Sequence, residues 1–318
     1  MFSIKEKSEN GFDKIVLCDE SSGTVAEVIP ACGALLHSFA VLHKGVMLNL
    51  VDHYADADEF KNNAEALGFK SCKLSPFVCR MKNGRYHFGE ADHTIEKFYL
   101  GKNAIHGLIY DALFTVTEIQ ATNENATVTM RHQYRGEDKG YPFNYDCLIS
   151  YQLKKENALT VTTEIINKDE CSIPIADGWH PYFSFGSSIN DLQLEFQSRE
   201  ILEFDEELIS TGKLIPYQEF GSLKNIGDVF FDNCFTLNFA ECQPMLVLRD
   251  SSQQLQLEIH PDKSYPYLQI YTPPHRKSIA IENLSAAPDA FNNAMGLITL
   301  TPGETALFKT TYKIASLT

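Results

Sequence analysis

The chain has 318 residues, of which 44% are hydrophobic and 22% charged, which is an ordinary globular composition. Its formal net charge of −15 repels phosphate backbones and acidic membrane surfaces, so we expect neither a nucleic-acid nor a membrane partner. The N-terminal stretch MFSIKEKSENGFDKIVL lacks the apolar core of a signal peptide, and no run of about 18 apolar residues occurs. We therefore expect a cytoplasmic protein.

Strands are predicted from the first part of the chain onward. The early stretch EVIPACGALLHSFAVL has the character of strands that are interrupted near Gly33. Residues 55–68, ADADEFKNNAEALG, differ because their apolar side chains recur at helical spacing and Gly68 is a candidate stop signal. This segment predicts a short helix that leaves the sheet.

Alternating hydrophobic and polar residues dominate the rest of the chain, as in ATVTMRHQY, CLISYQL, ALTVTTEII, LQLEI and YLQIYT. In ALTVTTEII one face carries Leu159, Val161, Thr163 and Ile165. A further helical turn is predicted at residues 288–291, and no linker or internal repeat is visible. These features predict an all-β fold, a large antiparallel sandwich of two sheets, formed by one domain over residues 1–318.

The segment ADGWHPYFSFG, residues 176–186, places His180 between Trp179 and Pro181 in apolar surroundings. Burying a polar ring requires hydrogen-bond partners or a use. One interpretation is a hydrogen-bonded core histidine. The other is a ligand cleft, in which Trp179, Tyr182 and Phe183 form flat walls suited to the apolar faces of a sugar, and the histidine exchanges a proton near neutral pH.

Two further segments hold candidate functional residues. In KNAIHGLIYD, His106 precedes Gly107, a residue that lets the backbone approach a neighbour closely. In SIAIENLSAAPDAFN, Glu282 ends an alternating strand and precedes a loop of small residues, where catalytic side chains are often found. Taken singly, each residue also fits a structural role, as a turn histidine or a solvated glutamate.

Together, IHG, WHPYF and IAIEN…PDAFN resemble, in this order, the aldose 1-epimerase (galactose mutarotase-like) family. LSPFVCRMKNGRYHFG is similar to the arginine-bearing segment of that family, FFDNCFTL to its sugar-binding aspartate segment, and GLITLTPGETALFKTTYKI to its closing strands. The resemblance runs from about residue 30 to the C-terminus. It implies the large antiparallel β-sandwich of that family, the supersandwich, which agrees with the alternation.

The resemblance also implies an activity, the interconversion of the α and β anomers of a free aldose. It implies that Glu282 is the general base and His180 the general acid, with His106 assisting at the ring oxygen or a neighbouring hydroxyl. Arg80 and Asp232 are implied to bind sugar hydroxyls. Because nearby carboxylates favour a positive charge, we expect His180 to be held as imidazolium.

The implied partner is a small sugar, bound by a monomer or a homodimer. No metal or organic cofactor is expected, because no electrons move in the reaction. The segment HFGEADH, residues 87–93, contains potential metal ligands, but their irregular spacing favours a hairpin turn.

The chain departs from the family pattern at three places. Cys79 stands before Arg80 where the family often has Asn, and Asn283 follows Glu282 where it often has Pro. Around His180 the sequence is Trp-His-Pro-Tyr-Phe rather than the Asn-His-Ser-Tyr-Phe type of the better-known galactose enzymes. These differences leave the preferred aldose open.

Three alternatives are compatible with the sequence. The first is a hexose-6-phosphate 1-epimerase of the same fold, for which the cluster of Arg131, Arg135 and Lys139 would bind the phosphate. The second is a non-catalytic sugar-binding module, and the third is a purely structural sandwich. The joint presence of histidine and carboxylate candidates favours an enzyme over the last two.

Overall fold

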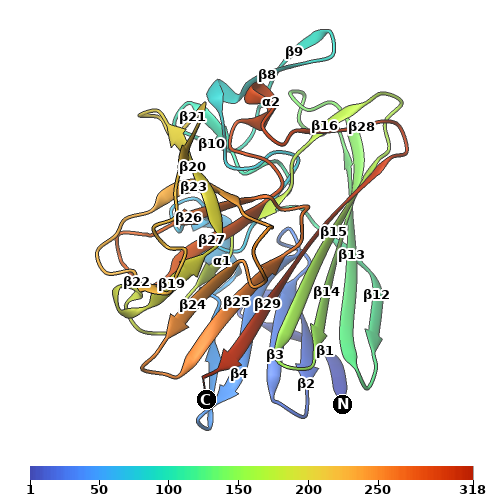
Figure 1. The fold of residues 1–318 in the computed structure, drawn as a ribbon. Coiled ribbons are helices and arrows are strands. Elements are labelled where there is room, and N and C mark those ends of the chain that lie inside the picture. Colours follow the sequence, from blue (N-terminus) through green and yellow to red (C-terminus); the bar gives the residue numbers. More distant parts are fainter. Residues whose placement is uncertain (318) are drawn as a thin grey trace.

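A nine-stranded antiparallel sheet forms one layer of the molecule (Figure 1). The computed structural model of the protein describes residues 1–317. In spatial order the sheet contains β12 (Thr115–Ala121), β13 (Asn125–Arg135), β14 (Asn144–Lys154), β15 (Ala158–Asn167), β29 (Thr305–Ser316), β25 (Leu255–Pro261), β24 (Leu246–Asp250), β19 (Gln193–Phe196) and β22 (Lys224–Asn225). The four side chains that were predicted to share one face of β15 are all buried, namely Leu159, Val161, Thr163 and Ile165.

The second layer consists of two sheets. The first is a meander of β1 (Phe2–Glu9), β2 (Phe12–Asp19), β3 (Thr24–Ile29), β4 (Leu35–His43) and β5 (Val46–Asn49). The second has eight strands, β21 (Ser210–Pro216), β20 (Ser198–Phe204), β23 (Asp232–Leu237), β26 (Tyr267–Tyr271), β27 (Ile279–Leu284), β17 (Gly178–Trp179) and β6 (Lys73–Leu74), with β18 (Tyr182–Phe183) also paired to β27. An antiparallel bridge between Val51 and Phe183 joins the two sheets.

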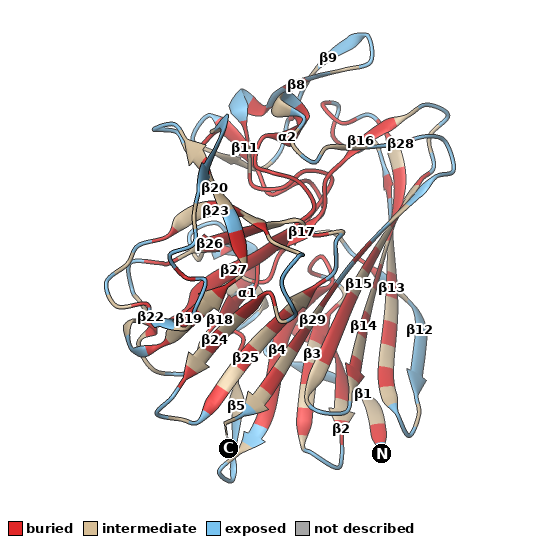
Figure 2. Cartoon of the chain, in the orientation of Figure 1, coloured by how far each residue is buried: buried red, intermediate tan, exposed pale blue. Residues whose placement is uncertain are grey.

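The hydrophobic core lies between the two layers, and Figure 2 shows buried residues alternating with partly exposed ones along many of the strands. Strand β2 of the meander packs on β13 and β14, and the ring of Phe183 lies 5.5 Å from that of Tyr312 on β29. Each fully buried large side chain contributes about 1.5–3 kcal/mol to folding. The predicted antiparallel sandwich is confirmed, and its second layer is built from two sheets.

Both predicted helical segments are present. α1 (Ala57–Asn63) begins after Asp56, whose side chain accepts a hydrogen bond from the Glu59 N–H and thereby caps the first turn. α2 (Ala290–Asn293) is a single turn, and two 3-10 turns, η1 (Lys82–Gly84) and η2 (Ile189–Asp191), complete the helical elements of residues 1–317. None of these helices is long and apolar enough to span a bilayer.

Three small sheets complete the fold. They are β10 (Tyr99–Leu100) with β11 (Asn103–Ile105) and β7 (Arg80–Met81), β16 (Ile173–Ile175) with β28 (Ile298–Leu300), and β8 (Arg85–Phe88) with β9 (Ala91–Thr94). In the β8–β9 hairpin His87 pairs with Asp92, and His93 stacks on Tyr86. The prediction of a hairpin in HFGEADH is therefore confirmed.

Candidate active site

Polar side chains gather on one face of the eight-stranded sheet. Pairing of β26 with β27 places Gln269 beside Glu282. Pairing of β23 with β26 places Cys234 beside Gln269 and Asp232 beside Tyr271. Because alternate residues of a strand share a face and cross-strand partners lie side by side, all five side chains project to the same side.

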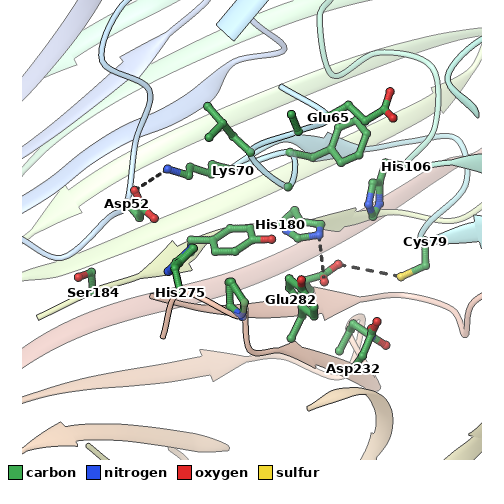
Figure 3. A pocket seen from close by; sticks show the side chains of 18 of the residues that line it. Asp52, Glu65, Lys70, Cys79, His106, His180, Ser184, Asp232, His275 and Glu282 are labelled. Carbon is green, nitrogen blue, oxygen red and sulfur yellow. Dashed lines mark hydrogen bonds and ion pairs between the residues drawn. The ribbon is translucent and has the colours of Figure 1, made fainter. Parts of the chain in front are cut away.

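His180 joins this face through its pairing with β27. Strands β17 and β18, which flank His180, both pair with β27, and their common register places His180 opposite Glu282. The His180 Nε2 lies 3.3 Å from Glu282 Oε1 (Figure 3). The backbone of His180 is fixed on its other side, where its N–H donates to the Cys72 carbonyl at 3.0 Å and its own carbonyl accepts from the Ser71 N–H at 2.8 Å.

His106, at the end of β11, completes the cluster. Its ring is perpendicular to that of His180, with 4.8 Å between the ring centroids. Gly107 holds this segment against the sheet, since a Cβ at this position would lie 2.2 Å from the Ser75 carbonyl oxygen. The close backbone approach predicted at Gly107 is thus confirmed.

These side chains open into a cavity of about 860 Å³. Six of the seven residues predicted for the site line it, namely Arg80, His106, His180, Tyr182, Asp232 and Glu282. The cavity volume lies within the range of roughly 300–1,000 Å³ that is typical of small-molecule sites. Segments that are far apart in sequence therefore meet around one ligand-sized space.

Trp179 and Phe183 do not line this cavity, which corrects the expectation that they form walls of the site. Successive residues of a strand point to opposite faces, so the indole projects away from His180 into the core. There its ring lies 5.9 Å from that of Tyr151, and the Lys73 ammonium lies 4.5 Å from the ring centroid. Tyr182, two residues after His180, faces the cavity instead.

Several polar groups in the cavity have unused hydrogen-bonding capacity. The Arg80 guanidinium makes no hydrogen bond or ion pair with any residue from 1 to 317. Gln269 donates from Nε2 to Asp232 at 3.0 Å, while its Oε1 is buried without a partner. Burial raises the pKa of Asp232, and the positive charge of Arg80 opposes that shift. Donors and acceptors are therefore available to bind hydroxyl groups.

Burial controls the protonation of the His180–Glu282 pair. It lowers the pKa of His180 to about 4, and it raises the pKa of Glu282 well above its usual value, with the Asp232 charge adding to the increase. The expectation that nearby carboxylates hold His180 as imidazolium is therefore wrong, because desolvation disfavours the charged form of the buried ring. Both shifts favour a neutral pair, in which one proton is held by the carboxyl group rather than by the imidazole.

His106 is also held neutral. Burial lowers its pKa well below the usual range, and the neighbouring His180 and Arg80 act in the same direction. One potential ligand atom each from His106, His180 and Glu282 lies within 4.8 Å of the others, a set that zinc accepts. However, the Nδ1 atoms of both histidines lack a partner within the described chain, whereas metal-bound histidines normally bond a second group through that nitrogen. The cluster therefore fits proton transfer better than metal binding.

Sequence reasoning missed several residues that line the cavity. Gln269 and Tyr271 lie on the same face of β26, and the alternation in YLQIYT was a readable signal for this pair. Asp52, Lys70 and His275 lie in loops, and no local pattern in the sequence marked them.

The chain is similar in sequence to aldose epimerases and in structure to galactose mutarotase-like proteins. A family profile described as Aldose 1-epimerase matches residues 13–313. The chain is 25% identical over 239 residues to the uncharacterized protein YihR of Escherichia coli (strain K12), covering 73% of this chain and 74% of that protein. It is 21% identical over 278 residues to a maltose epimerase of Levilactobacillus brevis, covering 81% and 79%. A solved galactose mutarotase-like protein from Clostridium acetobutylicum superposes with a TM-score of 0.88 at 19% identity, covering 99% of each chain.

Proposed function

The chain belongs to the aldose 1-epimerase family, and from this membership we propose that it interconverts the α and β anomers of a free aldose by general acid–base catalysis. Glu282 is the base and His180 the acid. The observation that carries this proposal is the cross-strand pair of these two side chains, 3.3 Å apart, which faces a cavity of ligand size. The unpartnered polar groups around the pair, the Arg80 guanidinium and Gln269 Oε1, suit a polyhydroxylated ligand.

The reaction needs one proton removed and one proton delivered. Glu282 takes the proton of the anomeric hydroxyl, the bond between the ring oxygen and the anomeric carbon breaks, and His180 protonates the ring oxygen. The aldehyde end of the open chain rotates, and closure on the other face reverses both transfers. Each positioned transfer contributes on the order of 10²–10⁴ in rate.

The shared proton must lie on His180 when the ring opens. Burial favours the neutral arrangement, with the proton on Glu282. Sugar hydroxyls that donate to the carboxylate replace the water it has lost and stabilise its ionised form. The proton then crosses the 3.3 Å gap to His180 with no change in the net charge of the pair.

The neighbouring residues orient the sugar. Arg80 donates to hydroxyls, and Asp232 with the free Oε1 of Gln269 accepts from them. The ring of Tyr182 stacks near that of His180, with centroids 5.2 Å apart and planes 14° from parallel, and forms a flat wall. His106 acts as a neutral hydrogen-bonding group at the ring oxygen or the adjacent hydroxyl.

A neutral substrate is favoured over a sugar phosphate. The basic cluster expected to bind a phosphate does not line the cavity, because Arg131 and Arg135 pair with Asp146 on the nine-stranded sheet at 2.5 and 2.7 Å. Lys139 is likewise not among the lining residues. Because one relative is a maltose epimerase, we include sugars with glucose at the reducing end among the candidate substrates.

The test is the decay of optical rotation of freshly dissolved single anomers of galactose, glucose, xylose and arabinose. We expect acceleration by the wild-type protein and a loss of at least about 100-fold in kcat for Glu282→Gln and for His180→Asn. Glu164→Gln and His87→Asn, which alter the same residue types outside the cavity, should retain the wild-type rate. Wild-type rates in either cavity variant would refute the assignment, and tight sugar binding without acceleration would indicate a binding module.

A further inference from the structure

The acid–base pair belongs to a larger cluster of side chains that are common metal ligands. One potential ligand atom each from His106, His180 and Glu282 lies within 4.8 Å of the other two, and residues 1–317 contain no second group of three such side chains gathered this closely. The Cys79 thiol is the fourth member, with its Sγ 4.0 Å from Glu282 Oε2. Figure 3 shows Cys79 and His180 both linked to Glu282, with His106 beside them.

The backbone holds the thiol next to the histidines. Cys79 lies directly before strand β7, and its carbonyl accepts a hydrogen bond from the His106 N–H at 2.9 Å. The side chain of Cys79 also lines the cavity together with the other three. Cys79 replaces the Asn that the family often has before the arginine, so the thiol is a feature of this chain.

The distances within the cluster are close to those around a tetrahedral ion. Zinc bonds nitrogen and oxygen at about 2.1 Å and thiolate sulfur at about 2.3 Å, so its ligand atoms lie roughly 3.4–3.7 Å from one another. The 3.3 Å between His180 Nε2 and Glu282 Oε1 already fits this requirement. The Cys79 sulfur and the His106 ring would need to move by at most about 1 Å, which rotation of their side chains into the cavity permits.

The ligand set also suits the charge of zinc. Two neutral imidazoles, the Glu282 carboxylate and the Cys79 thiolate balance the two positive charges of the ion, because a coordinated thiol loses its proton. A complex without net charge carries a smaller desolvation cost in a buried site. Of the charged neighbours that line the cavity, Asp232 attracts the ion and Arg80 repels it. Thiolate and imidazole ligands favour zinc over magnesium or calcium.

The surroundings of the two histidines limit the affinity. The Nδ1 atoms of His106 and His180 have no hydrogen-bond partner within the described chain. Partners at that nitrogen typically contribute about 10–100-fold to metal affinity. The ion should therefore exchange with solvent rather than remain as a resident cofactor, which agrees with proton transfer as the main role of the cluster.

We propose that Cys79, His106, His180 and Glu282 form a zinc site and that the bound ion is a reversible inhibitor. It occupies Glu282 and His180, so the sugar and the ion exclude each other. The inhibition rests on the proposed function, whereas binding of the ion does not.

The binding experiment uses cobalt as a spectroscopic substitute for zinc. The protein is freed of metal with a chelator and titrated with Co²⁺, and we expect one ion per chain with the absorption band of a thiolate–cobalt bond. Cys79→Ser should abolish this band. It should also raise the Kd for zinc, measured by calorimetry, at least about tenfold, since loss of a ligand costs no less than loss of its outer partner. Cys171→Ser, at an exposed free cysteine, is the matched control and should retain both properties.

His106→Asn provides a second variant. It should raise the Kd for zinc while the thiolate–cobalt band remains, which shows that the histidine and the thiol hold the same ion. In mutarotation assays zinc should raise the apparent KM for the sugar without lowering kcat, and a chelator should restore the original rate. Magnesium at the same concentration should have no effect.

Three outcomes separate the metal site, the inhibition and the proposed function. Equal zinc binding by the wild type and Cys79→Ser, with no thiolate band, would indicate an adventitious ion at a surface pair such as His87 and Asp92 and would overturn the site. A bound ion that leaves mutarotation unchanged would overturn the inhibition. If the metal-free protein converts no sugar, the proposed function fails, while the cobalt band still decides whether the metal site exists.

Discussion

The Cys79 thiol donates a weak hydrogen bond to the Glu282 carboxyl group, with 4.0 Å between Sγ and Oε2. A thiol is a weak donor and stabilises a carboxylate poorly. This contact agrees with a Glu282 pKa that burial raises well above its usual value. The departure from the family pattern at Cys79 therefore bears directly on the basicity of Glu282, the proposed catalytic base.

The pH profile of kcat/KM should report this environment. In the proposed mechanism the active His180–Glu282 pair holds one proton, so activity should be lost when a second proton binds or when that proton leaves. Because burial lowers the pKa of His180 to about 4, the acid limb should lie near pH 4 rather than near the 6.5 of an ordinary histidine. The basic limb should follow the raised pKa of Glu282.

Cys79→Asn should move the basic limb alone. An amide N–H stabilises the carboxylate form of Glu282, which lowers the pKa of this group and shifts the basic limb downward by about one pH unit. The backbone accommodates the change, since Cys79 has φ of 50°, a conformation that Asn adopts readily. Cys171→Asn, at an exposed free cysteine, is the control, and equal profiles in both variants would contradict the role of Cys79.

Local patterns account for much of the site at the residue scale. The motifs around His180 and Glu282 identified both as candidate functional residues. Because successive residues of a strand point to opposite faces, the sequence could also have shown that Trp179 and His180 face different sides of the sheet. The same rule explains Asn283, which points away from the cavity and accepts a hydrogen bond from Thr310 at 2.9 Å. The protonation of the pair was not predictable, because it depends on burial that only the assembled layers produce.

At the scale of the elements, a buried ion pair supports the strand that leads to His180. Lys73 on β6 has no exposed side-chain surface, and its ammonium pairs with the equally buried Asp177 at 2.6 Å. It also donates to the Gly178 carbonyl at 3.2 Å, and the Tyr265 hydroxyl donates to Asp177 at 2.7 Å. This network ties β6 to β17 next to the backbone that fixes His180.

Lys73→Met should therefore destabilise the protein severely. It leaves the Asp177 carboxylate buried without its counter-ion, which costs about 3–5 kcal/mol in the free energy of unfolding. Denaturant unfolding measures the loss. The double variant Lys73→Met with Asp177→Leu should recover most of it, because no unpaired charge remains. Lys313→Met, which removes a surface pair with Glu156, should cost less than about 1 kcal/mol. A double variant no more stable than the single one would show that the network matters for another reason.

The strands themselves were predictable, but their pairing was not. Alternation marked β15 and β26 correctly, because one face of each packs on the core. That Glu282 of β27 lies opposite both His180 and Gln269 depends on contacts between segments far apart in the chain. A slip of one residue in either pairing would turn Glu282 to the other face, so the site depends on a register that local sequence does not encode.

At the scale of the whole molecule, the nine-stranded sheet is covered by two sheets. The sequence did not predict that the second layer is divided into two sheets. The meander of β1 to β5 and the eight-stranded sheet show the same alternation of hydrophobic and polar residues, so nothing in the sequence distinguishes them. The two sheets share one hydrophobic core and are joined by the bridge between Val51 and Phe183. We propose on this basis that residues 1–318 fold as one domain.

One domain should unfold in a single transition. Chains beyond roughly 250–300 residues often divide into separate cores, so independent unfolding of the meander is the alternative. Trp179, the only tryptophan, reports on the eight-stranded sheet by fluorescence, whereas far-ultraviolet circular dichroism reports on all strands. Coincident urea transitions of the two signals are expected.

A bound sugar extends this test. A ligand at 100 times its Kd adds about 2.7 kcal/mol to the stability of the unit that binds it. In a single cooperative unit both signals shift together, although the sugar contacts only the cavity. If the meander unfolded alone, the dichroism would show an early step that the fluorescence of Trp179 does not detect. Because Val51 and Asp52 link the meander to the cavity floor, we expect the common shift.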